Sequence, residues 1–417
     1  MADKLKNLLL AALLALMGIL LAVTFLVGVR GSSGGQRLLR PLEEAERYEG
    51  ASAAHSAAQP EMLTLLAEQG VYLADNAEAY DLLLRQAEPL CQEAVGSAGT
   101  LQPLTEGEYL QLLQAPALLL QYHAPQPFYL LQAWGGSDTL REGVEVSGAA
   151  LAARDQTVVL LLTDRKGGRW LAETAASQTD LEALCANVTE SNARLAGEDG
   201  ALAGDAVLTL GVETAPVLSA VQPELARRGE LSQNVQSLFG MNAYLTKVYQ
   251  NTDGSLVYVE SHSTISLSPA GDLTYTGAGG IDLELTAPEG PAWQVELCQK
   301  VYDLLCRLWE QAGASGQLSL EELDVQGGRT VLRFGLHRSG LFAERREGHW
   351  ATVTVEDGAV TGLSAALRQL EETEQAPLLP LYQAAAVLPR GRAWLRVRLL
   401  EQQDGSLRPG ICRVTEE

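Results

Sequence analysis

The chain has 417 residues, with 52 acidic and 30 basic side chains and a formal net charge of −22 at pH 7. A surface this acidic repels the phosphates of nucleic acid, so nucleic acid is not an expected partner. Five cysteines are scattered without a C-x-x-C pair, which predicts buried small hydrophobes and neither a disulfide framework nor a zinc site; they are Cys91, Cys185, Cys298, Cys306 and Cys412.

Residues 8–29 form an uncharged run of mostly Leu, Ala, Val and Ile. As a helix it would span roughly 30 Å, which matches the hydrocarbon core of a bilayer. The run is longer than a signal-peptide core and no A-x-A site follows it, so we expect an uncleaved transmembrane helix. Lys4 and Lys6 favour a cytoplasmic tail over residues 1–7 and an extracytoplasmic C-terminal region, although three arginines lie beyond the run.

A stripe of small residues lies on one face of this predicted helix. Ala11, Ala15, Gly18 and Ala22 fall within about 60° of one another at about 100° per residue. Small side chains let two membrane helices approach closely, so we expect this stripe to bind a partner helix. The alternative is a chance alignment, because Ala and Gly are common in membrane helices.

After the anchor, the patterns predict an α+β fold of mixed antiparallel-sheet and helix lobes. We expect the following divisions: residues 30–60 as stalk and linker, 61–140 as a mainly helical subdomain, 141–290 as a central α+β domain and 291–417 as a C-terminal α+β domain.

The first part of this region alternates between helical and strand patterns. Helical spacing covers 61–69 and 77–95, and Thr105 with Glu108 predicts a capping box before a helix over 106–113. Further along we expect a strand at 117–122, an apolar segment at 128–134, a meander at 144–152, 157–163 and 169–173, helices at 180–194 and 225–239, and a strand at 206–212.

The second part is richer in hairpins. The turn Asn251–Gly254 predicts one hairpin, and a second is expected to end at Gly277–Gly280. We expect hairpin strands at 244–250 with 255–260, 264–268 with 273–276 and 350–355 with 359–363, helices at 293–311 and 378–388, and strands at 318–325, 330–337, 393–400 and up to Val414. The second and third hairpins share a pattern, which indicates either an internal duplication or a chance recurrence.

No nucleophile elbow, H-E-x-x-H motif or phosphate loop is present, so we expect no enzyme and no cofactor. His262 lies between two serines in a predicted strand, where an outward polar face is the simpler interpretation. Glu344, Glu347 and His349 could bind a metal, but they fall in a charged loop between strands. A loop of this composition is more often solvated than metal-binding. Glu321 is expected on a strand edge that discourages pairing with other sheets.

Several motifs resemble the YycH/YycI family, in particular its YycH branch. The matching stretches are Leu238-Phe239-Gly240-Met241-Asn242-Ala243-Tyr244, Tyr249-x-x-x-Asp253-Gly254-Ser255-x-Val257-Tyr258-Val259-Glu260, Leu267-Ser268-Pro269-x-Gly271-x-Leu273-x-Tyr275 and Tyr122-x-x-Pro125-x-Pro127-x-x-x-Leu131-x-x-Trp134-Gly135. Leu407-Arg408-Pro409 with Val414 resembles the closing strand of the family, but Gly410 and Ile411 stand where an aromatic residue is expected.

The resemblance implies a Gram-positive protein with one transmembrane helix and an extracytoplasmic α+β region. Such proteins bind the sensor histidine kinase of a two-component system for cell-wall metabolism, and the implied partners are that kinase and a sister YycI-like regulator. Two alternatives remain at this point: an anchored extracytoplasmic cell-wall enzyme, and an anchored scaffold or ligand-binding module, for which a large apolar cavity would be the sign.

Overall fold

The computed structural model describes residues 57–114, 116–188, 190–197, 202–210, 213–223, 225, 231–287, 289–338, 340–386 and 393–415. Every described residue belongs to one compact unit, Gly50–Glu417. Within these ranges no helix is long and apolar enough to cross a membrane. The predicted transmembrane helix at 8–29 and its small-residue stripe lie outside the described residues.

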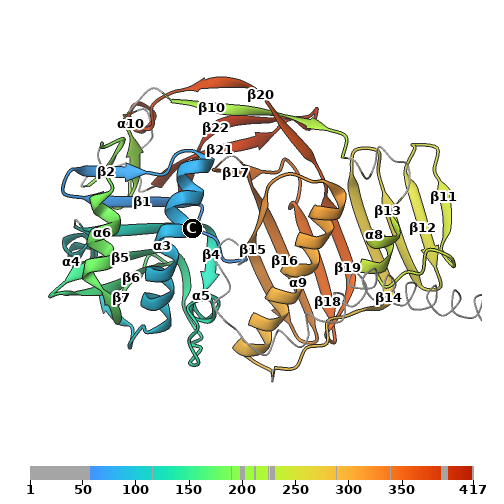
Figure 1. The fold of residues 1–417 in the computed structure, drawn as a ribbon, viewed down its shortest axis with the longest axis horizontal. Coiled ribbons are helices and arrows are strands. Elements are labelled where there is room, and N and C mark those ends of the chain that lie inside the picture. The colour runs from blue at the N-terminus through green and yellow to red at the C-terminus, as the bar shows by residue number, and fades with distance from the viewer. Residues whose placement is uncertain are drawn as a thin grey trace, which may run out of the picture. The chain divides into compact units, whose positions relative to one another are not determined.

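The first sheet has nine strands in the order β3-β7-β6-β5-β4-β1-β2-β8-β9 (Figure 1). Its strands are β1 (Met62–Ala67), β2 (Gly70–Leu73), β3 (Gln102–Leu104), β4 (Ala117–Pro127), β5 (Glu145–Arg154), β6 (Thr157–Asp164), β7 (Arg169–Ser177), β8 (Ala193–Leu195) and β9 (Val207–Thr209). The central strands are nearly continuous apolar runs; in β6, for example, residues 158–163 are all buried. Such runs are expected where both faces of a sheet are covered.

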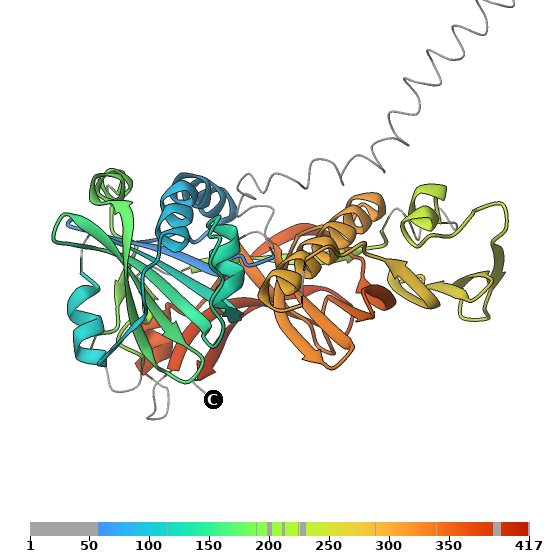
Figure 2. The same cartoon turned by 90° about the horizontal axis from the view of Figure 1, so that it is seen from below.

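Helices cover both faces of this sheet. Three pack on one face: α3 (Ala77–Gly96), α5 (Phe128–Trp134) and α6 (Gln178–Ala186). The helix α4 (Glu106–Leu112) lies on the other face, as Figure 2 shows. It begins with the predicted capping box, in which Thr105 and Glu108 satisfy each other's backbone N–H groups.

Two sequence predictions in this part are corrected, and a segment left without secondary structure is assigned. Residues 61–69 were expected to be helical, but they contain β1, which pairs with β4 and β2 and is buried from Leu63 to Ala67. A fully buried strand and a buried helical face carry the same apolar residues, so spacing alone could not separate them. The apolar segment 128–134 is the helix α5, and α6 ends at Ala186, well before the predicted limit at 194.

The second sheet has 13 strands in the order β11-β12-β13-β14-β19-β18-β16-β17-β21-β22-β10-β20, with β15 paired to β16. Among its described strands, β17 and β21 pair in parallel and the other pairs are antiparallel. Its strands are β10 (Glu213–Val221), β11 (Lys247–Gln250), β12 (Leu256–Glu260), β13 (Ser263–Leu267), β14 (Asp272–Asp282), β15 (Gln317–Gln326), β16 (Arg329–Arg338), β17 (Leu341–Glu344), β18 (Ala351–Glu356), β19 (Ala359–Ala366), β20 (Gln369–Leu378), β21 (Ala393–Glu401) and β22 (Leu407–Thr415).

The described residues of this part include the helices α8 (Gln233–Leu238), α9 (Pro291–Ala312) and α10 (Leu381–Ala386). The longest, α9, lies across the strands β16 and β18 (Figure 1). It fully buries one stripe formed by Leu297, Val301, Leu305 and Leu308, whose spacing of three and four residues defines a single helical face. The predicted helix at 293–311 is therefore confirmed.

The predicted hairpins are also present, with two corrections. Gly277–Gly280 was expected to end the unit, but β14 continues through it to Asp282, with an irregular register against β19 between Thr276 and Ile281. The predicted helix at 378–388 starts three residues later, at Leu381, because β20 occupies the chain up to Leu378. The last strand, β22, pairs with β21 along its length despite Gly410 and Ile411.

The fold is thus mixed α+β with antiparallel sheets, as predicted. The expected domain limits at 140/141 and 290/291 fall within the segments that build the two sheets, and they stay predictions.

All five cysteines are free; Cys91, Cys185 and Cys298 are buried, whereas Cys306 is exposed and Cys412 is partly exposed.

The turn between β11 and β12 allows a first stability prediction. Gly254 has φ +86°, and its N–H donates to the Asn251 carbonyl at 3.0 Å. A branched side chain is strained at this φ, so Gly254→Val is expected to lower the free energy of unfolding by about 1–3 kcal/mol. Urea unfolding of the full chain in detergent measures it. The exposed neighbour Thr252 is the control, since Thr252→Val should change stability by less than about 0.5 kcal/mol; equal effects of the two variants would contradict the assignment.

Candidate functional site

The two sheets meet along a seam between β4 of the first and β15 of the second, which lie side by side in Figure 1. The Gln126 side-chain amide donates to the Leu320 carbonyl at 2.7 Å, and the Leu320 N–H donates to the Ala57 carbonyl at 2.8 Å. The seam therefore brings together side chains that are far apart in the sequence.

A buried ion pair crosses this seam. Glu61, just before β1, is 4% exposed, and its oxygens lie 3.0 Å from Nε and 3.3 Å from Nη2 of Arg398 on β21. Arg396 Nε is 3.8 Å away. Burial alone would raise the pKa of Glu61, but the charges of Arg398, His123 and Arg396 outweigh it and lower that pKa to about 2. The Glu61 carboxylate is therefore charged at neutral pH.

A second carboxylate on the seam is held by two histidines. His123 Nε2 on β4 lies 3.0 Å from Glu321 Oε1, and His349 Nδ1 contacts Oε2 of the same glutamate. Burial raises the pKa of Glu321, but the hydrogen bonds and charges of the two histidines lower it overall. Glu321 was expected on a strand edge that discourages pairing, but its carboxylate is instead engaged by His123 and His349. The register of β15 shifts between Leu320 and Glu322, and such a bulge re-aims a side chain.

Phe342 on β17 forms the apolar centre of the seam. Its ring stacks on His123 with centroids 3.3 Å apart, and the His337 ring meets it edge-on at 5.3 Å. The Arg398 guanidinium carbon lies 5.5 Å from the ring centroid, on the ring face. We refer to these six residues as the seam cluster: Glu61, His123, Glu321, His337, Phe342 and Arg398.

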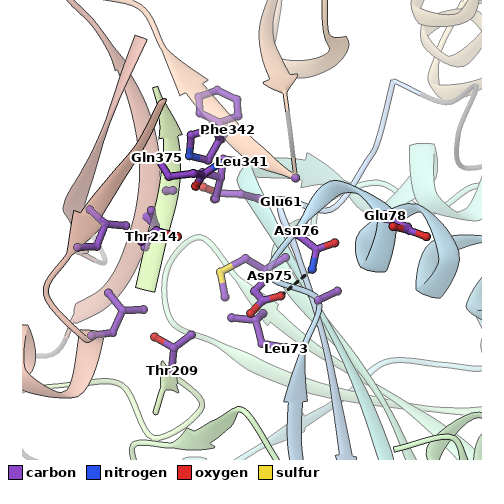
Figure 3. A pocket seen from close by; sticks show the side chains of 18 of the residues that line it. Glu61, Leu73, Asp75, Asn76, Glu78, Thr209, Thr214, Leu341, Phe342 and Gln375 are labelled. Atoms are coloured by element: carbon purple, nitrogen blue, oxygen red, sulfur yellow. Dashed lines mark hydrogen bonds between the residues drawn. The ribbon is translucent and has the colours of Figure 1, made fainter. Parts of the chain in front are cut away.

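A cavity of about 380 Å³ opens beside the seam cluster (Figure 3). Both sheets contribute to its wall, with Leu73 and Thr209 from the first and Thr214 and Gln375 from the second. Glu61 and Phe342 belong to the wall as well as to the seam cluster. Because its lining mixes apolar, polar and acidic side chains, the cavity suits a small ligand better than a lipid chain.

The three residues considered as possible metal ligands, Glu344, Glu347 and His349, form no metal site among the described residues. Glu344 Oε2 lies 3.6 Å from Arg398, and His349 is taken up by Glu321. In the part of the chain that the structure describes, no three His, Cys, Asp or Glu residues are placed to hold a metal ion.

Sequence reasoning missed the ion pair across the seam. The only local signals were Glu61 at the head of an apolar run and the alternating Arg396 and Arg398 in an apolar strand.

A separate exposed region includes β11, the end strand of the second sheet, and the turn just before it. Tyr244 and Leu245 in the turn are 87% and 67% exposed, and Val248 and Tyr249, on opposite faces of β11, are each 53% exposed. We call these four residues the edge patch. The opposite end strand, β20, carries acidic side chains at 371, 372 and 374 and a proline at 377, which protect an edge against pairing.

No protein-family model matches the sequence, and no curated protein matches it. Among solved structures, the crystal structure of YycH from Bacillus subtilis is similar, with a TM-score of 0.55 and 10% sequence identity. The match covers 88% of this chain and 96% of that chain. The resemblance found in the sequence motifs is therefore confirmed at the level of the fold, and the chain has a YycH-like fold.

Proposed function

We propose that the protein is a membrane-anchored extracytoplasmic regulator that modulates a sensor histidine kinase of a two-component system for cell-wall homeostasis. The observation that carries the proposal is the YycH-like fold over 88% of the chain. Sequence motifs at 122–135 and 238–275 also resemble that family. The apolar run at 8–29 supports a single-pass anchor with a cytoplasmic N-terminus. In this proposal the protein acts by contact, with the kinase and a sister YycI-like regulator as partners.

The edge patch supports a contact role for the extracytoplasmic region. Exposed apolar clusters of this kind mark interaction sites, and an end strand leaves one row of backbone N–H and C=O groups free for an added strand. Residues 243–250 carry a single charge, Lys247, in a chain of net charge −22. An acidic or neutral partner strand can therefore approach here without the repulsion that the remaining surface imposes. We assign this patch to an extended segment of the kinase's extracytoplasmic domain.

Copurification of the full chain with the kinase from membranes tests the proposal. Tyr249→Glu places a charge on the edge patch and is expected to reduce kinase recovery about tenfold or more. Leu379 is 62% exposed but lies outside the patch, so Leu379→Glu is the matched control and should leave recovery unchanged. If the unmodified chain recovers neither the kinase nor a sister regulator, the proposal is abandoned.

The same assay separates the anchor from the edge patch. Gly18→Ile fills the predicted small-residue stripe, whereas Leu16→Ile changes another face of the same helix. We expect the first to weaken recovery and the second to have no effect at matched expression. Equal recovery with both variants would show that contact runs through the extracytoplasmic region alone.

The cavity beside the seam supports a second candidate, an anchored ligand-binding module. A volume of about 380 Å³ accommodates a small polar molecule, and the cavity lies between two sheets, a common position for ligand sites. A ligand in this cavity would touch Glu61 and Phe342 of the seam cluster and none of the edge-patch residues. Ligand binding and kinase contact are therefore compatible.

A further inference from the structure

Three of the five histidines of the chain gather at the seam. Histidine is the side chain whose charge ordinarily changes between pH 5 and 8, so this grouping makes the seam sensitive to mild acid. His123 and His349 each contact an oxygen of Glu321, whereas His337 contacts Phe342. A proton on His337 therefore has a different effect on the seam from a proton on His123 or His349.

His337 is the histidine for which a proton is unfavourable. It is 7% exposed, and its Nε2 has no hydrogen-bond partner among the described residues. The charged groups that face it come from four surrounding segments: Glu61 before β1, His123 on β4, Glu321 on β15 and Arg398 on β21. Both carboxylates are already engaged, Glu61 with Arg398 and Glu321 with two histidines.

A proton on His337 would thus place a poorly hydrated cation near the Arg398 guanidinium, with no free carboxylate to balance it. The net result is that burial lowers the pKa of His337 from 6.5 to about 4, the attraction of Glu61 offsetting only part of the effect. If the sheets part at the seam, water hydrates the imidazolium and the ordinary proton affinity returns.

The other two histidines act in the opposite direction. Protonated His123 and His349 would each pair more strongly with Glu321, which stays ionised because its pKa is held below the usual range. Loosening of the seam therefore depends on His337.

We propose that the seam is an acid-sensitive joint, which His337 keeps closed while neutral and loosens when it takes up a proton. This regulatory device goes beyond the proposed kinase contact and needs no partner. The sign follows from linkage: a depressed histidine pKa contributes stability above pH 6.5 that is lost as the pH falls from 6.5 towards 4.

Hydrogen–deuterium exchange of the full chain in detergent at pH 7.5 and 5.5, corrected for intrinsic exchange rates, tests the joint. Amides of β4 and β21 are expected to open about tenfold more at pH 5.5 than at pH 7.5, as the lowered pKa of His337 predicts. Amides of the β12–β13 hairpin, which lies away from the seam, should change little.

Two variants make the test specific. His337→Gln keeps a polar side chain that cannot be protonated, so acid loosening at the seam should disappear; His337→Phe serves the same purpose if the first variant folds poorly. His262, exposed in the β12–β13 turn, is the control, and His262→Gln should retain the full effect. Acid loosening that persists without His337, or its absence in the unmodified chain, would overturn the proposal.

Discussion

Arg398→Met is expected to lower the free energy of unfolding by about 3–5 kcal/mol, because it leaves a buried carboxylate without its main partner. Glu61 is 4% exposed, and both its oxygens receive hydrogen bonds from the Arg398 guanidinium. Arg396 stays 3.8 Å from Glu61 and replaces only part of the lost attraction. Urea unfolding of the full chain in detergent measures the change.

Two further variants control this result. Glu61→Met combined with Arg398→Met removes both charges and should regain most of the lost stability. Arg333→Met breaks a 2.6 Å ion pair with Glu322, whose side chain is 52% exposed, and should cost less than about 1 kcal/mol. If Arg398→Met is no worse than Arg333→Met, the ion pair across the seam does not stabilise the fold.

The pH dependence gives an independent check of the same pair. The lowered pKa of Glu61, about 2 against an ordinary 4.5, means that its contribution is complete above pH 4.5 and is lost as the pH falls towards 2. The stability difference between the unmodified chain and Arg398→Met should therefore shrink across this window. A difference that stays constant from pH 5 to pH 2 would contradict the assignment.

Phe342→Ala has the second large expected effect, a loss of about 3–5 kcal/mol from removal of a buried ring and the space left behind. The ring is 1% exposed and packs between His123 and His337, beneath Arg398. Its neighbour Gly335 leaves room for it, since a Cβ there would lie 2.4 Å from the ring. Phe342 also lines the cavity beside the seam, so its truncation enlarges an existing space.

Thermal or urea unfolding measures this effect, with Leu379→Ala as the control. Leu379 is 62% exposed, so its truncation should change stability by less than about 0.5 kcal/mol. Similar losses for the two variants would mean that Phe342 does not hold the two sheets together.

Local signals explain which elements could be predicted. The capping box at Thr105, the hairpin turns near Gly254 and Gly271, and the single apolar stripe of α9 each depend on residues a few positions apart. The failures share another cause. The run after Glu61 and the segment before Leu381 owe their structure to strands that pair with them from elsewhere in the chain, so tertiary pairing overrode spacing and propensity.

The sequence by itself determined the α+β class, the candidate anchor and the motifs of the YycH-like fold, because periodicity, turn chemistry and apolar length are local properties. Only the tertiary structure decided the seam. Glu61 and Arg398 are separated by 337 positions, and Glu321 receives histidines from β4 and from the loop before β18. Such a cluster exists because two sheets meet there and exclude water, and no local pattern in the chain encodes that meeting.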